Sequence, residues 1–351
     1  MSWRPGGMLG IDMGVARRWV SWSSTMSHMV CASSGRDAVC VTLVVVLVGV
    51  SFGCRPEPPP PAPSFRAAQV VGSPVEGTWE RAAEQGLQRI GQELGAAVSS
   101  VRAAEDSPRR AELRRLGAKG TDLVFCVGAG FDSMLYTEAA SYPDTAFVLL
   151  PGAGRAGNVV GVSFEVAGAC YAGGVVAAAL ARKPVVAILH GGGGPWLEGA
   201  EDGFVAGFRS LRPDGTLVVA NAPEGVRDLV AEGATVALYV TDRAEQQVLV
   251  EADSVGLKLV VTDPEALGQG PSTVLAAVAV DVPEAMVRVA RDVREGTFRG
   301  RIYVFDVGSG VVSLVPGSLL ESHPDPSLQA ALDTALAEVT AGIVEIKQLG
   351  F

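Results

Sequence analysis

Short apolar segments alternate with amphipathic segments along most of this chain, and this alternation limits the folds open to it more than any other feature. The apolar segments have the length of buried strands, about four to eight residues. The amphipathic segments carry apolar residues at helical spacing, as Leu87, Ile90 and Leu94 do within Trp79–Leu94. Strands that alternate with helices form parallel sheets covered by helices on both faces. The pattern therefore predicts an α/β fold.

Two successive series of strands and helices are present. The expected strands are Ala67–Val71, Ala97–Arg102, Asp122–Val127, Ala146–Leu150, Val159–Phe164, Pro184–His190, Leu217–Ala220, Ala234–Val240, Lys258–Val261 and Val274–Val280. The expected helices are Trp79–Leu94, Ser107–Leu116, Asp132–Ala140, Val166–Ala181, Trp196–Leu211, Val226–Glu232, Ala244–Ser254 and Pro283–Glu295. Two series predict two doubly wound lobes with a cleft between them, and ligands of such sheets bind beyond the carboxyl ends of the strands.

An apolar run near the N-terminus, Ala38–Phe52, is shorter than the ~20 residues that a membrane-spanning helix needs. Arg36 precedes the run and Gly53 and Cys54 follow it, an arrangement typical of a secretory signal. The next segment, Arg55–Pro63, is a polar tether rich in proline. A small residue, a cysteine and such a tether resemble a bacterial lipoprotein signal, in which Cys54 becomes the first residue and carries a lipid such as palmitate.

Two other interpretations of the apolar run stay open, an uncleaved membrane anchor and a buried helix. Met26 or Met29 would place the start of the chain closer to the run than Met1 does.

The charge balance excludes some classes of partner. The chain has 28 Lys and Arg against 38 Asp and Glu, a formal net charge of −10. Nucleic-acid binding needs a basic surface, so we expect no nucleic-acid partner. A polybasic second signal for membrane adhesion is also missing from the sequence, so the lipid alone would hold the protein at a membrane.

Cys126 and Cys170 are the cysteines of the predicted lobes, and both lie in apolar segments. They either form a disulfide in an exported protein or remain two buried thiols. The sequence shows no spacing of metal ligands, and we expect neither a metal nor a cofactor.

The first strand-to-helix turn offers three candidate ligand-binding residues. Trp79 lies at the start of a helix, where an indole can stack on a planar ligand. Glu76 and Glu80 flank it and can accept hydrogen bonds from hydroxyl groups. The alternative is that Trp79 covers the core while the two carboxylates favour the helix N-terminus.

The second and third turns add Phe131, Asp132 and Trp196. Taken alone, Asp132 is better suited to cap its helix than to bind a ligand. The third turn, from His190 to Trp196, is rich in glycine but lacks the Lys and Ser or Thr of a phosphate loop. Its histidine has no partner in the sequence and is expected to be structural.

Asp242 and Asp263 end two neighbouring predicted strands. Either carboxylate can bind a ligand hydroxyl, and either can also cap the segment that follows. No nucleophile elbow, zinc motif or kinase signature is present, so an enzyme is not expected.

Six segments occur in the order seen in the basic membrane protein lipoproteins, and the chain resembles this family from about Phe65 to Phe305. The segments are Gly86–Leu87, Asp122–Gly128, Tyr142–Phe147, Asn158–Phe164, Gly168–Gly173 and Glu201–Gly207. The family comprises substrate-binding components of nucleoside ABC transporters. The resemblance implies a type I periplasmic-binding-protein fold with two α/β lobes that close on a ligand about a hinge.

The ligand-binding motifs of the family differ in this chain. The opening aspartate of the family aligns with Glu76, and its Ser-Phe-Asn motif becomes Thr78-Trp79-Glu80. The aspartate of its next turn falls on Ser133, beside Asp132.

In the second lobe, a phenylalanine of the family falls near Ala200, with Trp196 one helical turn earlier. Its Gly-Val-Asp turn becomes Val261-Thr-Asp263, and its lysine falls near Val280. Each lost hydrogen bond to a charged group removes about 1.5–3 kcal/mol, so the resemblance predicts the fold better than the ligand.

The expected organisation has five parts. A leader covers residues 1–53, the tether covers 54–64, an N-lobe covers 65–161 and a C-lobe covers 162–262. Residues 263–351 are expected to return to the N-lobe and end in a hinge and helix segment.

These observations predict a lipid-anchored, extracytoplasmic solute-binding protein of an ABC transporter that binds a nucleoside or a similar planar, hydroxylated molecule. Its partners would be a transporter permease and, through the lipid of Cys54, a membrane. The alternative is a binding-protein scaffold that has lost transport and serves as a sensor or a structural lipoprotein. A hydrolase acting on a nucleoside-like substrate has no supporting motif.

Replacing the anchor cysteine, Cys54→Ser, should release the protein from the membrane and leave the fold intact, because only the lipid would hold it there. Membrane fractionation and mass spectrometry of the N-terminal peptide measure both effects. An unlipidated Cys54 in an uncleaved, membrane-embedded chain would contradict this interpretation.

Overall fold

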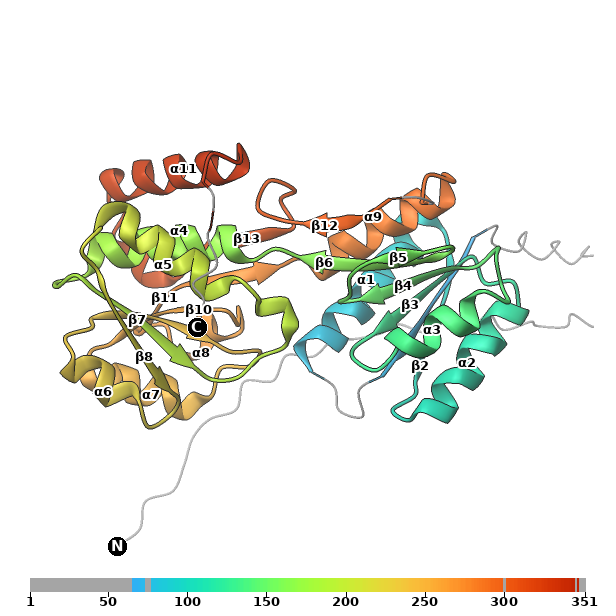
Figure 1. The fold of residues 1–351 in the computed structure, drawn as a ribbon, viewed down its shortest axis with the longest axis horizontal. Helices are drawn as coiled ribbons and strands as arrows, with labels where there is room; N and C mark the ends of the chain where they lie inside the picture. The colour runs from blue at the N-terminus through green and yellow to red at the C-terminus, as the bar shows by residue number, and fades with distance from the viewer. Residues whose placement is uncertain (1–64, 73–76, 299–300, 345, 347–351) are drawn as a thin grey trace, which may run out of the picture. The chain divides into compact units, whose positions relative to one another are not determined.

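The computed structural model describes residues 65–72, 77–298, 301–344 and 346. Within this part of the chain the strands form two sheets (Figure 1), as the alternating pattern predicts. The leader, Cys54, the whole tether and Glu76 lie outside the described residues.

The first sheet has the strand order β12-β6-β4-β3-β1-β2, and β5 pairs antiparallel with β6. All the other neighbours in this sheet are parallel. Its strands are β1 (Arg66–Val71), β2 (Ala97–Arg102), β3 (Leu123–Val127), β4 (Ala146–Leu150), β5 (Arg155–Ala156), β6 (Val159–Phe164) and β12 (Tyr303–Phe305).

The second sheet has the order β13-β11-β10-β9-β7-β8 and is parallel except for β13, which pairs antiparallel with β11. Its strands are β7 (Val185–His190), β8 (Thr216–Asn221), β9 (Val236–Val240), β10 (Lys258–Val261), β11 (Val274–Val280) and β13 (Val312–Pro316). The second sheet thus continues past residue 262, where the sequence analysis ends the C-lobe, because β11 and β13 complete it.

Helices cover both faces of each sheet. Those of the first lobe are α1 (Thr78–Leu94), α2 (Asp106–Ala118), α3 (Asp132–Ala139) and α9 (Val282–Arg294). The helices of the second lobe are α4 (Ala167–Leu180), η1 (Pro195–Leu197), α5 (Ala200–Leu211), α6 (Val226–Ala231), α7 (Gln246–Val255), α8 (Ala266–Gln269), α10 (Ser318–Ser322) and α11 (Pro326–Thr340).

Alternation along the strands divides the core into layers. In β1, Ala67 and Val71 pack with α1 and α9, whereas Ala68 and Val70 pack with α2 and α3. Because successive side chains of a strand point to opposite faces, a fully apolar strand supplies both layers at once.

The structure differs from the predicted elements in several places. The helix predicted from Trp196 is divided into η1 and α5, because Gly199 adopts a positive φ of 78°. The strands β12 and β13 and the helices α10 and α11 follow the last helix for which the sequence analysis gives bounds; it expects only a C-terminal hinge and helix segment there.

Cys126 and Cys170 are free and buried, so the interpretation as two thiols is confirmed. Burial raises the pKa of both thiols. Among the described residues, no helix combines the length and the apolar character needed to cross a membrane.

The chain passes between the sheets three times, from β6 to α4, from β11 to α9 and from β12 to β13. Backbone hydrogen bonds join these crossings. The Glu165 N–H donates to Phe305 O at 2.8 Å, and the Asp281 N–H donates to Val311 O at 2.8 Å. The crossings therefore form one connected hinge region.

Glycines allow α4 and α5 to pack in close contact (Figure 1). A Cβ atom added at Gly207 would lie 1.9 Å from the carbonyl oxygen of Tyr171, and one at Gly203 would lie 2.1 Å from that of Ala167. Since both neighbours are backbone atoms, the helices would have to move apart to admit a side chain.

We expect Gly207→Ala to lower the free energy of unfolding by about 2 kcal/mol, because overpacking costs more than the gain in helix propensity. The matched control is Gly268→Ala in α8, where an added Cβ meets nothing within 4 Å. Urea unfolding of both variants measures the difference, and equal stabilities would show that the helices can separate at little cost.

Candidate functional site

Four of the predicted ligand-binding residues line one small pocket at the carboxyl ends of strands. The pocket has a volume of about 50 Å³, and its walls include Trp79, Trp196, Asp242 and Asp263. The remaining walls are Thr78, Ala82, Thr262, Pro264, Val278, Val280 and Val282. The sequence analysis thus identified residues from separate turns that the fold brings together.

Trp79 is held by the first turn of α1 and is half-buried. Its ring centroid lies 5.3 Å from that of Phe164 and 5.2 Å from that of Trp196, with the two indoles at 67° to each other. The Glu80 carboxylate accepts a hydrogen bond from the Gly77 N–H at 2.8 Å, so it closes the start of the helix rather than facing a ligand.

Trp196 lies in η1, after a run of four glycines. Its indole N–H donates to the Asp242 carboxylate at 2.5 Å. Asp242 follows β9 and is itself exposed, so the indole and the carboxylate form a pair at the mouth of the pocket.

Asp263 is 2% exposed and fixes the backbone around it. Its two oxygens accept hydrogen bonds from the Ala244 N–H at 2.8 Å and the Glu265 N–H at 3.0 Å. Burial raises the pKa of this carboxyl, and the two backbone donors oppose that rise. Asp263 therefore acts as a cap at the wall of the pocket.

Phe131 is fully buried, and the structure does not bring it to the pocket. The Arg109 guanidinium covers its ring at 5.1 Å from the centroid. Asp132 is exposed in the first turn of α3 and makes no side-chain capping hydrogen bond, since Phe131 holds the N-cap position. The expectation that Asp132 caps this helix is wrong for that reason.

Arg109 organises the turns at this edge of the first sheet, and sequence reasoning missed it. The side chain is only 8% exposed and also pairs with Asp106 at 3.3 Å. Its donors reach backbone carbonyls that follow β1, β2 and β3, namely those of Gly72 (2.7 Å), Ala103 (2.9 Å), Ala104 (2.8 Å) and Gly130 (3.3 Å). One guanidinium thus donates hydrogen bonds to carbonyls in three turns, and no local pattern in the sequence indicates these contacts.

A second missed contact joins α1 to the turn before α8. Arg81 donates to the Glu265 carboxylate at 2.5 Å, and both side chains are 44% exposed. Like the pair of indoles, this ion pair connects an element of the first lobe with one of the second.

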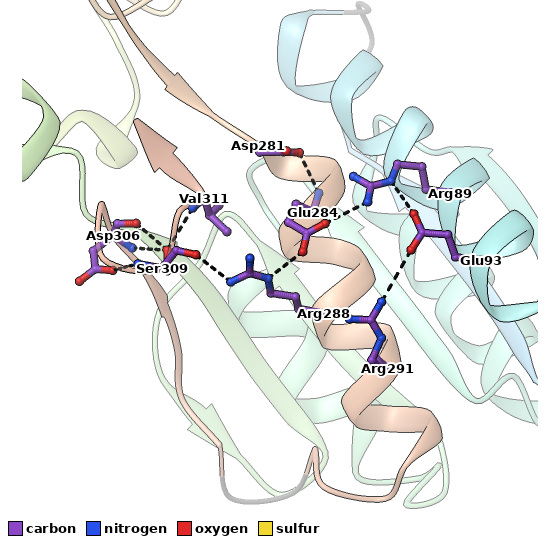
Figure 2. A network of polar contacts seen from close by, with 9 residues as sticks. All are labelled: Arg89, Glu93, Asp281, Glu284, Arg288, Arg291, Asp306, Ser309 and Val311. Carbon is purple, nitrogen blue, oxygen red and sulfur yellow. Dashed lines mark hydrogen bonds and ion pairs between the residues drawn. The ribbon is translucent and has the colours of Figure 1, made fainter. Parts of the chain in front are cut away.

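Aromatic rings continue from the pocket into the hinge region. Phe164 ends β6 and lies 6.1 Å, centroid to centroid, from Phe305, which ends β12. The Arg288 guanidinium lies 6.0 Å from the centre of the Phe305 ring and donates to the Ser309 carbonyl at 2.9 Å. Figure 2 shows Arg288 reaching from α9 to the β12–β13 crossing.

The same network ties α9 to α1 (Figure 2). Glu284 accepts from Arg288 at 2.8 Å and from Arg89 at 2.9 Å. The hydrogen bond from Arg288 and then that from Arg89 lower the pKa of Glu284, against the effect of burial. The network therefore persists at neutral pH and weakens only as the pH falls through the lowered pKa of this carboxyl.

His190 has a partner that its sequence context did not reveal. Its Nδ1 atom lies 3.2 Å from a carboxylate oxygen of Glu201 in the first turn of α5. Burial raises the pKa of Glu201. The charge of His190 opposes this rise, and the charge of Asp202 adds to it.

A larger hollow of about 370 Å³ lies at the opposite, N-terminal ends of strands in the first sheet. Phe65, Asp122 and Asn158 line it, together with residues that follow α9. The smaller pocket is the candidate ligand site, because ligands of open parallel sheets bind at the carboxyl ends. Nowhere in the described part of the chain do three His, Cys, Asp or Glu side chains gather as a metal site would require.

Two mainly parallel sheets joined by three crossings define a periplasmic-binding-protein-like fold, here with a pocket at the carboxyl ends of the strands. Residues 67–341 match the family described as ABC transporter substrate-binding protein PnrA-like, or Bmp. The chain belongs to this family, as its ordered motifs indicate. The family and the fold are those of substrate-binding proteins and not of enzymes.

Two relatives carry different functional names. The chain is 26% identical over 207 residues to the transcriptional activator protein med of Bacillus subtilis (strain 168), which covers 56% of this chain and 64% of that protein. The match thus spans less than two thirds of that relative. The chain is 21% identical over 276 residues to a purine-binding protein of Brucella abortus (strain 2308), covering 75% of this chain and 77% of that protein.

The similar solved structures also include both a transcriptional activator and a solute-binding protein. A transcriptional activator of the comK gene from Bacillus halodurans superposes with a TM-score of 0.68 at 23% identity, over 79% of this chain and 97% of that one. An ABC transporter solute-binding protein from Conexibacter woesei superposes with a TM-score of 0.63 at 20% identity, over 81% of this chain and 98% of that one. At these identities the similarity shows the fold alone.

Arg109→Met should lower the free energy of unfolding by about 3 kcal/mol, because several buried carbonyls lose their donors together. Hydrogen exchange should also accelerate at Gly128–Phe131. The control is Arg115→Met on the same helix, whose ion pair with Glu112 is partly exposed at 44% and 25% and should be worth less than about 1 kcal/mol. Similar losses in both variants would contradict the role given to Arg109.

Proposed function

We propose that this protein is the lipid-anchored substrate-binding component of an ABC transporter and binds a nucleoside or a similar planar, hydroxylated molecule. The observation that carries the proposal is the meeting of Trp79 and Trp196, whose rings contact each other at the carboxyl ends of strands from both sheets. Indole faces at this position favour a planar ligand ring. The family supports an extracytoplasmic partner of a transporter.

Polar groups next to the indoles suit a hydroxylated ligand. The Asp242 carboxylate lies at the pocket mouth, and Thr78 and Thr262 line the walls. Asp132 and Glu76 follow strands of the first sheet and complete the set of acceptors that we assign to the ligand, with Glu76 placed by its sequence position alone. A relative named as purine-binding supports the planar base, and a structural neighbour solved with 5-methylthioribose, at a TM-score of 0.54, supports the ribose.

Cys54 is the proposed site of the lipid. The tether of residues 55–64 separates it from the first described strand, β1, which begins at Arg66.

A thermal-shift panel of nucleosides, free bases and pentoses tests this function. A ligand at 100 times its Kd should stabilise the fold by about 2.7 kcal/mol, seen as a rise of several degrees in Tm. Trp79→Ala should remove the shift, while the surface control Val250→Ala, at a side chain 58% exposed, should keep it. No shift from any compound on a folded wild-type protein would contradict the proposal.

The second candidate is a binding-protein scaffold that acts as a sensor without transport. The small pocket volume of about 50 Å³ and the two relatives named as transcriptional activators favour it. A failed ligand panel would support this candidate, whereas turnover of any compound would point to an enzyme instead.

A further inference from the structure

The pocket is too small for the ligand that its walls suit. Its volume of about 50 Å³ compares with the roughly 300–1,000 Å³ of pockets that enclose small molecules. Some group that now lines the pocket must therefore move before a nucleoside-sized molecule can enter.

Trp196 is the lining aromatic residue with the weakest attachment to the fold. It belongs to a three-residue 3₁₀ turn between Gly192 and Gly199, which have positive φ values of 84° and 78°. Trp79, in contrast, belongs to a helix of 17 residues and also packs on Phe164. Movement of the glycine-flanked turn costs fewer contacts than movement of α1.

The contacts of Trp196 are those that a planar ligand would make. Its ring packs against Trp79, and its N–H donates to the Asp242 carboxylate at 2.5 Å. We infer that Trp196 is a placeholder, whose indole occupies the site of the ligand ring. The indole leaves when a planar heteroaromatic ring with an N–H donor takes its place. That ring then packs on Trp79 and donates to Asp242. This inference rests on the proposed function and names the chemistry that selects its ligand.

Two consequences follow from such a placeholder. Displacement of the indole lowers the apparent affinity, because only the fraction of molecules with Trp196 withdrawn can bind. A ring that lacks the N–H donor binds more weakly still, since Asp242 then loses its partner.

The experiment compares inosine, which carries a ring N–H, with 1-methylinosine, which does not. Isothermal titration calorimetry on the full chain should give Trp196→Ala an affinity for inosine about tenfold or more above that of the wild type. Both proteins should prefer inosine over 1-methylinosine by about tenfold, and Asp242→Ala should abolish this preference.

Trp196→Phe serves as the second variant, because it keeps most of the packing on Trp79 but frees Asp242. It should remain folded by circular dichroism and bind inosine with an affinity between those of the wild type and Trp196→Ala. Weaker inosine binding by both Trp196 variants than by the wild type would show that the indole is a wall of the site, which overturns the inference.

A separate probe distinguishes this inference from the proposed function. Indole should raise the Tm of Trp196→Ala more than 1-methylindole does, and Asp242→Ala in that background should equalise the two. If inosine binds no variant but indole behaves in this way, the placeholder site stands and the nucleoside function fails. If neither inosine nor indole binds Trp196→Ala, the inference itself is overturned.

Discussion

Contact between aromatic rings links the pocket to the hinge region of this protein. Trp196, Trp79, Phe164 and Phe305 form a continuous row with centroid separations of 5.2, 5.3 and 6.1 Å. The first two rings line the pocket, and the last two end strands from which the chain crosses to the other sheet. The row therefore places the walls of the pocket in direct contact with the segments that cross between the sheets.

Most strands and helices up to about residue 295 could be predicted from periodicity, since the apolar segments alternate regularly with amphipathic ones; short elements such as β5, η1 and α8 could not. Strand order could not be predicted in the same way. The antiparallel partner of β11 is β13, which begins about thirty residues after β11 ends, and the apolar content of Val312–Pro316 does not specify that pairing. Local patterns determine the elements, whereas the order within a sheet depends on contacts between distant residues.

The grouping of residues at the candidate pocket could be predicted in part. Trp79, Trp196, Asp242 and Asp263 meet at one pocket because each follows the carboxyl end of a strand, which the alternation already locates. Phe131 follows a strand too, but the structure buries it beneath Arg109. Sequence position fixes the end of the sheet at which a side chain lies, and it does not fix whether the side chain turns inward. The fold and the family are therefore better determined than the ligand.

The ion pair between Arg81 and Glu265 is a second contact between the lobes, and it is electrostatic rather than aromatic. Both side chains are 44% exposed, so dissolved ions screen their attraction, with a Debye length of about 8 Å at physiological ionic strength. The adjoining contact between Trp79 and Trp196 carries no net charge and is not screened in this way. A rise in salt concentration would therefore weaken one of these two contacts and spare the other. Ionic strength thus changes the balance between the two contacts without altering either lobe.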